Sequence, residues 1–254
     1  MRLLIQFVVL ALMGAGCLGQ APLWPLPGTD FEEKQPYAAF VQPTAAGTPE
    51  SALFGCDRNS GTRFHEAIDL APVLPRKSGR TTDPVQAIYG GRVSHINRIS
   101  GNSSYGRYVV VEHIGLEPAV YSLYAHLASI PDSLAVGDSV KAGDELGILG
   151  RSAGGYTIPR SRAHLHLEVG LRLSDDFESW YQRNRYSSPN LHGDYNGMNL
   201  IGLDPLDFFI AFRDGRVATI LEYLEQVRPA LMLHLRTRRY PDFLERYPQL
   251  KLDG

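Results

Sequence analysis

The chain has 254 residues, of which 44% are hydrophobic and 20% charged, with a formal net charge of −2. This balance is typical of a globular protein with its own core and excludes wholesale disorder. The charge leaves no excess of cations to neutralise a phosphate backbone, so no nucleic-acid partner is expected. The 25 Gly, 17 Pro, 13 Tyr and 10 Phe favour strands and turns over a helical bundle.

The N-terminal segment, residues 1–20, has the pattern of a secretory signal. Arg2 is followed by an apolar run over residues 3–15 that only Gln6 interrupts. A membrane-spanning helix needs about 20 apolar residues, and this run is shorter. A basic start and a short apolar stretch predict export to the cell envelope (the periplasm or an outer-membrane anchor) or secretion. An uncleaved N-terminal anchor is the alternative.

Two cleavage sites compete at the end of this segment. Cys17 follows the small residues 14–16 and resembles the lipidated cysteine of a bacterial lipoprotein box, although Gly14 stands where that box usually has Leu. This predicts a lipid anchor at Cys17. A conventional cut near Gln20 is the other interpretation, and both stay open. Cys56 is then an odd cysteine, expected to behave as a small buried hydrophobe.

The rest of the chain divides into three parts by composition. Residues 21–52 carry six prolines and few periodic apolar positions, which predicts an extended Pro-rich lead or linker. Residues 53–212 read as dense short strands, and residues 213–254 as a C-terminal helical appendage. In that tail, apolar side chains recur at helical spacing: Val217, Ile220, Leu221, Leu224 and Val227.

The middle part predicts a mainly β fold, a compact antiparallel β-sheet domain with barrel-sandwich-like hairpins. Apolar or alternating runs with turn residues between them lie at 85–89, 91–96, 108–112 and 121–124. Residues 136–147 pair apolar positions with regularly placed glycines. This stretch resembles the hairpin of barrel-sandwich domains such as lipoyl carriers, but it has no convincing lysine at its tip, so it is interpreted as scaffold.

Two short patterns carry the chemistry. His65 and Asp69 are four residues apart, and His164 and His166 are two apart in an apolar run. On a strand, even spacing places both side chains on one face. Two His and one Asp would leave an open fourth position on a metal ion, as a hydrolytic zinc requires, while another His stands over it.

The chain resembles the lysostaphin-type (LytM-like) zinc metalloendopeptidases, which cut the peptide cross-links of bacterial peptidoglycan. The resemblance covers roughly residues 54–212 and rests on four motifs in the family's order: RFHEAIDLAP (63–72), YGRYVVVEH (105–113), LYAHL (123–127) and HLHLEV (164–169). It implies one zinc ion per chain, peptidoglycan as substrate, and an active site in a groove across the sheet.

Carried over motif by motif, the resemblance implies that His65, Asp69 and His166 are the zinc ligands. His126 and His164 would be the unligated catalytic histidines, one accepting a proton from the zinc-activated water and the other steadying the oxyanion. Three features depart from the family pattern. Ala67 stands where Gly is usual, residues 57–61 offer no tyrosine, and the loops at 73–84 and 154–163 look long.

Two other functions are weighed against the endopeptidase. A catalytically silent relative that binds the wall and activates another hydrolase would typically lose ligands, whereas this chain keeps all five positions. Another exported zinc hydrolase, such as a carboxypeptidase or amidase, could use a similar His and Asp set, and products of digested muropeptides separate it from an endopeptidase. A lipoprotein at the outer membrane would favour direct D-alanyl to diaminopimelate bridges as the bond cut.

Overall fold

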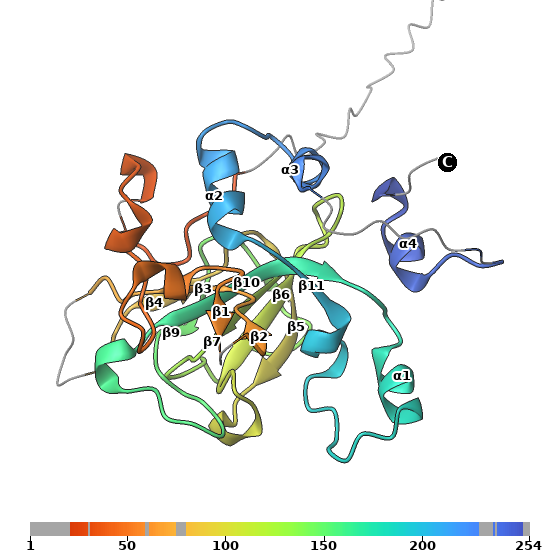
Figure 1. The fold of residues 1–254 in the computed structure, drawn as a ribbon, viewed down its shortest axis with the longest axis horizontal. Coiled ribbons are helices and arrows are strands. Elements are labelled where there is room, and N and C mark those ends of the chain that lie inside the picture. Colours follow the sequence, from red (N-terminus) through yellow and green to blue (C-terminus); the bar gives the residue numbers. More distant parts are fainter. Residues whose placement is uncertain are drawn as a thin grey trace, which may run out of the picture.

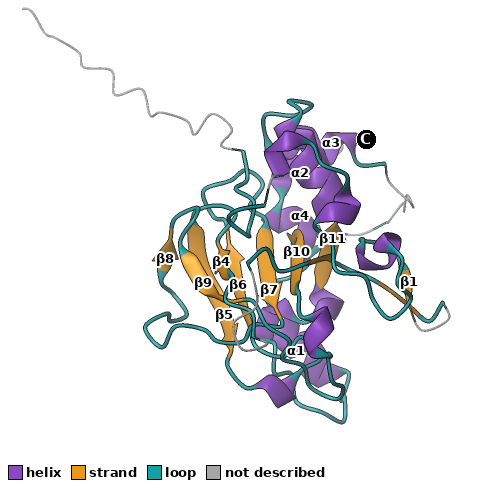
Figure 2. Cartoon of the chain, turned by 90° about the vertical axis from the view of Figure 1, so that its left-hand side faces the viewer, coloured by secondary structure: helices purple, strands orange, loops and turns teal. Residues whose placement is uncertain are grey.

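The structure is a computed structural model, and it describes residues 21–29, 31–58, 61–74, 80–228, 236 and 238–250. Its centre is a seven-stranded antiparallel sheet with the strand order β11-β10-β7-β6-β5-β8, in which β3 also pairs with β10. Figures 1 and 2 show these strands side by side. The strands of this sheet are β3 (Ile68–Leu70), β5 (Gly91–Asn97), β6 (Tyr108–Glu112), β7 (Tyr121–Ala125), β8 (Ser139–Val140), β10 (Leu165–Arg172) and β11 (Leu200–Leu203).

Two two-stranded sheets, four α-helices and several short 3₁₀ helices accompany the large sheet. Strand β1 (Asp57–Arg58) pairs with β2 (Arg63–Phe64), and β4 (Pro84–Gln86) pairs with β9 (Glu145–Ile148). The helices are α1 (Phe177–Arg183), α2 (Pro205–Arg213), α3 (Ile220–Gln226) and α4 (Asp242–Arg246). In the view of Figure 2, α2 and α3 lie above the sheet and α1 lies below it.

Strand β10 has partner strands along both of its edges, and all eight of its residues are buried. One edge of β10 pairs with β7. The other edge pairs first with β3 and then with β11. An antiparallel strand with partners on both edges needs apolar side chains on the face toward the core, which Leu165, Leu167 and Val169 provide. The alternate residues of β10 are left to the opposite face.

The antiparallel β fold is therefore confirmed, and the expected strands at 85–89, 91–96, 108–112 and 121–124 correspond to β4 to β7. The middle part also contains helices that the pattern of short strands did not predict. Helix α1 lies between β10 and β11, and α2 closes this part with Phe208 and Phe209 buried in the core. Asp204 caps α2 by accepting hydrogen bonds from the backbone N–H groups of Leu206 and Asp207.

The Pro-rich lead is packed against the domain. It contains short 3₁₀ turns, and its side chains Leu26, Phe31, Phe40 and Val41 belong to the same core cluster as the sheet. Trp24 stacks on Phe31 with ring centroids 4.1 Å apart and contacts Phe209 of α2 edge-on. The lead is irregular, as its prolines predict, but its aromatic residues bury it.

The described tail is helical in two short pieces. Ile220 and Tyr223 of α3 are buried, and Thr219 caps this helix. Near the end of the chain, the buried Tyr247 accepts a hydrogen bond from the backbone N–H of Arg172 on β10, which ties α4 to the sheet. Residues 229–235 of the expected helical appendage, the signal segment 1–20 and Cys17 lie outside the described residues. Within the described ranges, no helix has the length and apolar character needed to cross a bilayer.

Cys56 is half-buried and has a free thiol, and its Sγ lies 3.3 Å from the carbonyl oxygen of Ser51. His113 is fully buried at the end of β6. Its Nδ1 lies 3.1 Å from the carbonyl oxygen of Gly90, and its Nε2 lies 2.8 Å from Ser122 Oγ. A neutral ring that donates from Nδ1 and accepts at Nε2 satisfies both contacts. Burial lowers the pKa of His113 to about 4.

This neutral imidazole makes the stability depend on pH. The unfolded His has a pKa of about 6.5, so the contribution of His113 is fully present above that pH and is lost as the pH falls toward 4. Between pH 7 and pH 4.5 we expect this group to remove roughly 2–3 kcal/mol from the free energy of unfolding. His113→Gln should show a shallower loss, measured by denaturant unfolding at both pH values.

His95 serves as an internal control, because burial also lowers its pKa to about 4 and it titrates in both proteins. The difference between the two pH profiles therefore isolates His113. Equal losses of stability in the wild type and in His113→Gln would contradict the assignment.

Candidate metal centre

Asp69 and His166 meet because of strand register. Asp69 on β3 stands directly opposite His166 on β10, and His166 in turn stands opposite Ala125 at the end of β7. Directly opposed residues of an antiparallel pair place their side chains on the same face, with Cβ atoms about 4.5–5.5 Å apart. His65 comes from the link between β2 and β3 and is 1% exposed.

The donor atoms of these three residues converge on one point. His65 Nε2 and His166 Nδ1 each lie 3.1 Å from Asp69 Oδ1, and the two nitrogens lie 3.3 Å from one another. Tetrahedral zinc with bonds of about 2.0–2.1 Å separates its ligand atoms by about 3.3 Å. The spacing of the three donors therefore fits a single small divalent cation.

In His65 and His166, the ring nitrogen that points away from Asp69 (the outer nitrogen) has an oxygen acceptor nearby, as is common in metal-binding histidines. His65 Nδ1 lies 3.0 Å from the carbonyl oxygen of Leu53, and His166 Nε2 lies 3.3 Å from Glu168 Oε1. When these nitrogens donate, the lone pairs of His65 Nε2 and His166 Nδ1 are turned toward Asp69. Metal-binding histidines commonly have this second hydrogen bond, which fixes both tautomer and ring orientation.

The electrostatics of the cluster favour a positive charge at its centre. Burial alone would raise the pKa of Asp69, but the imidazoles of His164 and His65 and a hydrogen bond from His166 hold that pKa well below its usual range. Burial alone would lower the pKa of His166, yet its hydrogen bonds with Asp69 and Glu168 raise it to about 10. A proton or a metal ion at His166 Nδ1 supplies the charge that these carboxylates demand.

His126 and His164 stand beside the three donors. The His126 ring centroid is 4.8 Å from that of His164 and 5.5 Å from that of His166. His164 Nε2 lies 3.6 Å from Asp69 Oδ1. The structure thus brings together all five residues that the sequence singled out. His65 and His164 were expected on strands, but each lies just outside one, next to β2 and β10 respectively.

The two flanking imidazoles are also oriented by their outer nitrogens. His126 Nδ1 lies 2.8 Å from the carbonyl oxygen of Ser152, and His164 Nδ1 lies 2.7 Å from that of Arg162. Donation from Nδ1 leaves Nε2 of each ring unprotonated. Burial lowers the pKa of His126 well below its usual range and lowers that of His164 as well. Both rings are therefore neutral at pH 7 and able to accept a proton.

His126 occupies an unusual backbone conformation. It follows β7 with a φ of +61°, a left-handed value that is uncommon for a residue other than glycine. Its N–H donates to the carbonyl oxygen of Tyr105, and its carbonyl accepts from the N–H of Ser152. Gly106 has a φ of +65°, and a Cβ there would lie 2.1 Å from Ser152 O. The bend that turns His126 toward its neighbours therefore depends on a glycine next to Tyr105.

A second group of carboxylates and tyrosines lies behind His166. Tyr121 donates to Glu168 Oε2 at 3.2 Å, and Tyr105 donates to Glu66 Oε1 at 3.2 Å. Burial raises the pKa of both tyrosines, and the nearby Glu168 raises it further, so both hydroxyls stay protonated donors. Atoms of Glu66, Glu168 and His166 also lie within 4.8 Å of one another. Glu168 is itself buried on β10, two residues after His166.

An open cavity of about 130 Å³ lies in front of the cluster. Asp69, His126 and His164 contribute to its wall, and the lead contributes residues 42–44. Arg58 of β1 also lines it and donates from Nη2 to Asp69 Oδ2 at 2.8 Å. Neither Arg58 nor the lead could be placed at this site from the sequence, because no spacing pattern connects them to the histidines.

Comparisons with known proteins were made for sequence and for structure. The family model for peptidase family M23 matches residues 63–176. A search of curated proteins gives no match. A zinc-containing peptidase from Vibrio cholerae is 23% identical, with a TM-score of 0.39. The match covers 59% of this chain and 37% of that one, so this chain aligns with little more than a third of that protein.

Two other solved structures are similar to a comparable degree. The catalytic domain of lysostaphin from Staphylococcus simulans is 22% identical, with a TM-score of 0.39 and coverage of 62% of this chain and 89% of that one. The catalytic domain of the prophage-encoded M23 protein EnpA from Enterococcus faecalis is 24% identical, with a TM-score of 0.37 and coverage of 59% and 85%. Because these TM-scores are low, the comparison that bears on function is the match of the M23 family model to residues 63–176.

The first prediction for this centre concerns metal content. Asp69→Ala and His166→Ala each remove one of three ligands, so we expect the purified variants to lose bound zinc. His126→Ala should keep close to one zinc per chain, because that ring is held by Ser152 and supplies none of the three converging donors. Elemental analysis after equilibrium with buffered zinc measures the stoichiometry. Full zinc content in His166→Ala would show that the ligand set is wrong.

A graded variant tests the same centre without removing a ligand. Glu168→Gln keeps an acceptor near His166 Nε2 but removes its charge, so we expect about 10- to 100-fold weaker zinc affinity, measured by chelator competition. Glu145→Gln, at an exposed residue of β9, is the matched control and should leave the affinity unchanged.

Proposed function

Because the family model for peptidase family M23 matches residues 63–176, we propose that this chain is a zinc metalloendopeptidase that hydrolyses peptide cross-links of bacterial peptidoglycan. The observation that carries the proposal is the convergence of His65 Nε2, Asp69 Oδ1 and His166 Nδ1 within 3.1–3.3 Å of one another, beside two neutral imidazoles. Three protein ligands with an open position are the arrangement of catalytic rather than structural zinc sites.

Zinc bound at this centre would lower the pKa of a water molecule and polarise the scissile carbonyl. The chain's own residues supply the rest. Arg58 and the β3–β10 register hold Asp69, while Leu53 and Glu168 orient the two ligand imidazoles. The buried surroundings strengthen each of these interactions, because little water is present to screen them.

His126 and His164 would carry out the proton transfers of the reaction. Both are neutral, both present Nε2 as the free nitrogen, and both line the open cavity. One ring accepts the proton of the attacking water at Nε2, and the Nε2–H formed there can donate a hydrogen bond to the developing oxyanion. The ring that takes up the proton then returns it to the leaving amine, so the cycle ends with both imidazoles neutral.

We expect the wild type to release monomers from purified cross-linked muropeptides without trimming their terminal residues. His126→Ala and His164→Ala should lower kcat by about 10²- to 10⁴-fold while retaining zinc, because each removes a proton-handling group rather than a ligand. Chromatography of the digest measures products and rate. Zinc-loaded wild type that cleaves nothing would favour a silent wall-binding protein, and trimmed monomers would favour a carboxypeptidase.

Export is part of the proposal, because peptidoglycan lies outside the cytoplasm. Its support is the pattern of residues 1–20, a basic start followed by a short apolar run and small residues. The mass of the mature N-terminus distinguishes the two processing routes. A lipid on Cys17 would indicate an envelope anchor, a terminus near Ala21 would indicate a conventional signal, and an intact Met1 in cytoplasmic fractions would contradict export.

A further inference from the structure

A second and larger cavity adjoins the catalytic one. Its volume is about 540 Å³, and it shares the wall formed by residues 156–158 with the cavity over the metal centre. The Tyr156 ring centroid is 6.5 Å from that of His126. Ser152, whose carbonyl binds His126 Nδ1, also lines the larger cavity. A peptide lying across the metal centre can therefore continue directly into this second cavity.

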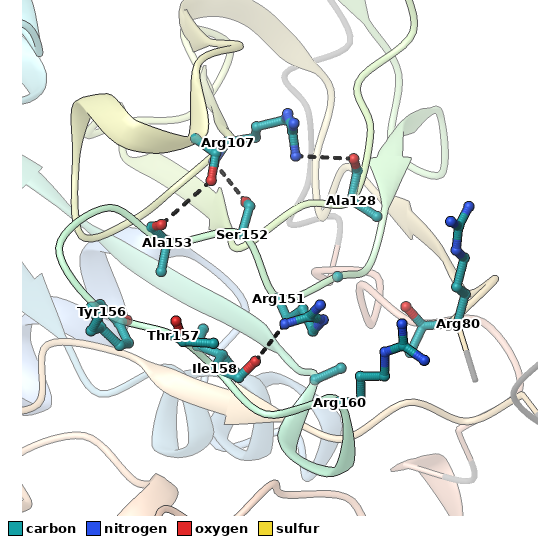
Figure 3. A pocket seen from close by; sticks show the side chains of 14 residues that line it. Arg80, Arg107, Ala128, Arg151, Ser152, Ala153, Tyr156, Thr157, Ile158 and Arg160 are labelled. Atoms are coloured by element: carbon teal, nitrogen blue, oxygen red, sulfur yellow. Dashed lines mark hydrogen bonds between the residues drawn. The ribbon is translucent and has the colours of Figure 1, made fainter.

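The lining of this cavity is strongly cationic. Fourteen described residues line it, and they include Arg80, Arg107, Arg151 and Arg160 but no Asp or Glu. Figure 3 shows Arg80, Arg151 and Arg160 along one side of the cavity and Arg107 across from them. Among the ion pairs of the described residues, none involves these four side chains. The chain as a whole has a net charge of −2, so this concentration of positive charge is local.

Two of the arginines are held in place by backbone carbonyl groups. Arg151 donates from Nη1 to the carbonyl oxygen of Ile158 at 2.9 Å. Arg107 donates from Nε to that of Arg98 at 3.2 Å and from Nη1 to that of Ala128 at 3.3 Å. A guanidinium carries five N–H donors, so these bonds leave several donors on each side chain. Arg160 is exposed and completes the rim.

The guanidinium N–H groups that line this cavity are suited to bind a planar carboxylate. A guanidinium binds a carboxylate through two parallel hydrogen bonds, and such charge-assisted bonds are about twice as strong as neutral ones. The neighbouring cavity over the metal centre is where the proposed peptidase function places a peptide. An acidic peptide is therefore the ligand that satisfies both the charge of this cavity and its position.

We propose that the cavity lined by Arg107, Arg151 and Arg160 is a subsite for a free carboxylate of the peptide substrate, close to the bond that is cut. The inference rests on the proposed peptidase function for the position of the peptide, whereas the binding of the carboxylate needs no catalysis. Binding of a carboxylate in this cavity makes the enzyme selective for cross-links flanked by an acidic residue, compared with the same cross-links in which that carboxylate is amidated.

The test combines two ligands with three proteins. The ligands are a cross-linked muropeptide with free carboxylates and the same compound with those carboxylates amidated. The proteins are the wild type and Arg151→Gln/Arg160→Gln, with Arg92→Gln as a matched control at an exposed arginine of β5 outside the cavity. Calorimetry on the metal-free proteins measures binding, and kcat/KM of the zinc-loaded proteins measures turnover.

We expect the wild type and Arg92→Gln to bind the free carboxylate compound about 10- to 100-fold more tightly than the amidated one, and to show a similar ratio in kcat/KM. Arg151→Gln/Arg160→Gln should reduce the ratio to near one, with unchanged turnover of the amidated compound and an unchanged melting temperature. Amidating the α-carboxyl and side-chain carboxyl groups separately identifies which of them is bound.

Other outcomes overturn the inference. Equal weakening with both compounds would mean that the arginines serve the fold or the general approach of ligands. Tighter binding of inorganic phosphate than of the free carboxylate compound, lost in the same variant, would assign the cavity to a phosphate-bearing polymer. If no protein turns over either compound, the peptidase proposal fails, while the calorimetric ratio still decides for or against the carboxylate subsite.

Discussion

The site depends on one constraint, the register of β10 between β3 and β7. His166 is opposite Asp69 of β3 on one side and Ala125 of β7 on the other. The position of His166 therefore determines where Asp69 lies and where β7 ends and bends into His126. A slip of one residue would turn every side chain of β10 to the opposite face. Leu165, Leu167 and Val169, all buried in the core, resist such a slip, because it would bring the two histidines and Glu168 into that core.

This coupling explains which parts of the structure the sequence could predict. Alternation of apolar and polar residues is a local property, and it was sufficient for strands β4 to β7 and for placing His166 on β10 on the same side as His164, which directly precedes this strand. Convergence of the five site residues could be expected from the motifs and their order. The strand partners themselves are not encoded by any local pattern, and the same alternation would be compatible with several sheet orders.

The features that the sequence did not predict are set by contacts between distant segments. Arg58 reaches Asp69 through the β1–β2 hairpin, although nothing in its surroundings differs from an ordinary turn. The lead was interpreted from its prolines as a linker, yet Val41 bridges to Leu70 of β3 and the N–H of Gln42 donates to the carbonyl of Asp69. Prolines exclude a regular strand in the lead, but they do not prevent a short segment from satisfying one edge of β3.

Acidic and basic side chains lie in different regions around the three donors. Behind His166, Glu66 and Glu168 are held by tyrosine hydroxyl groups, so negative charge concentrates on the inner side of the three donors. In front of them, Arg58 and Arg162 line the catalytic cavity, and further arginines line the cavity beside it. A cation between these two regions is attracted by the inner carboxylates, whereas an anionic peptide is attracted by the outer arginines. The metal ion and an acidic substrate therefore have different charged partners, so binding of the substrate need not compete with the carboxylates for the metal.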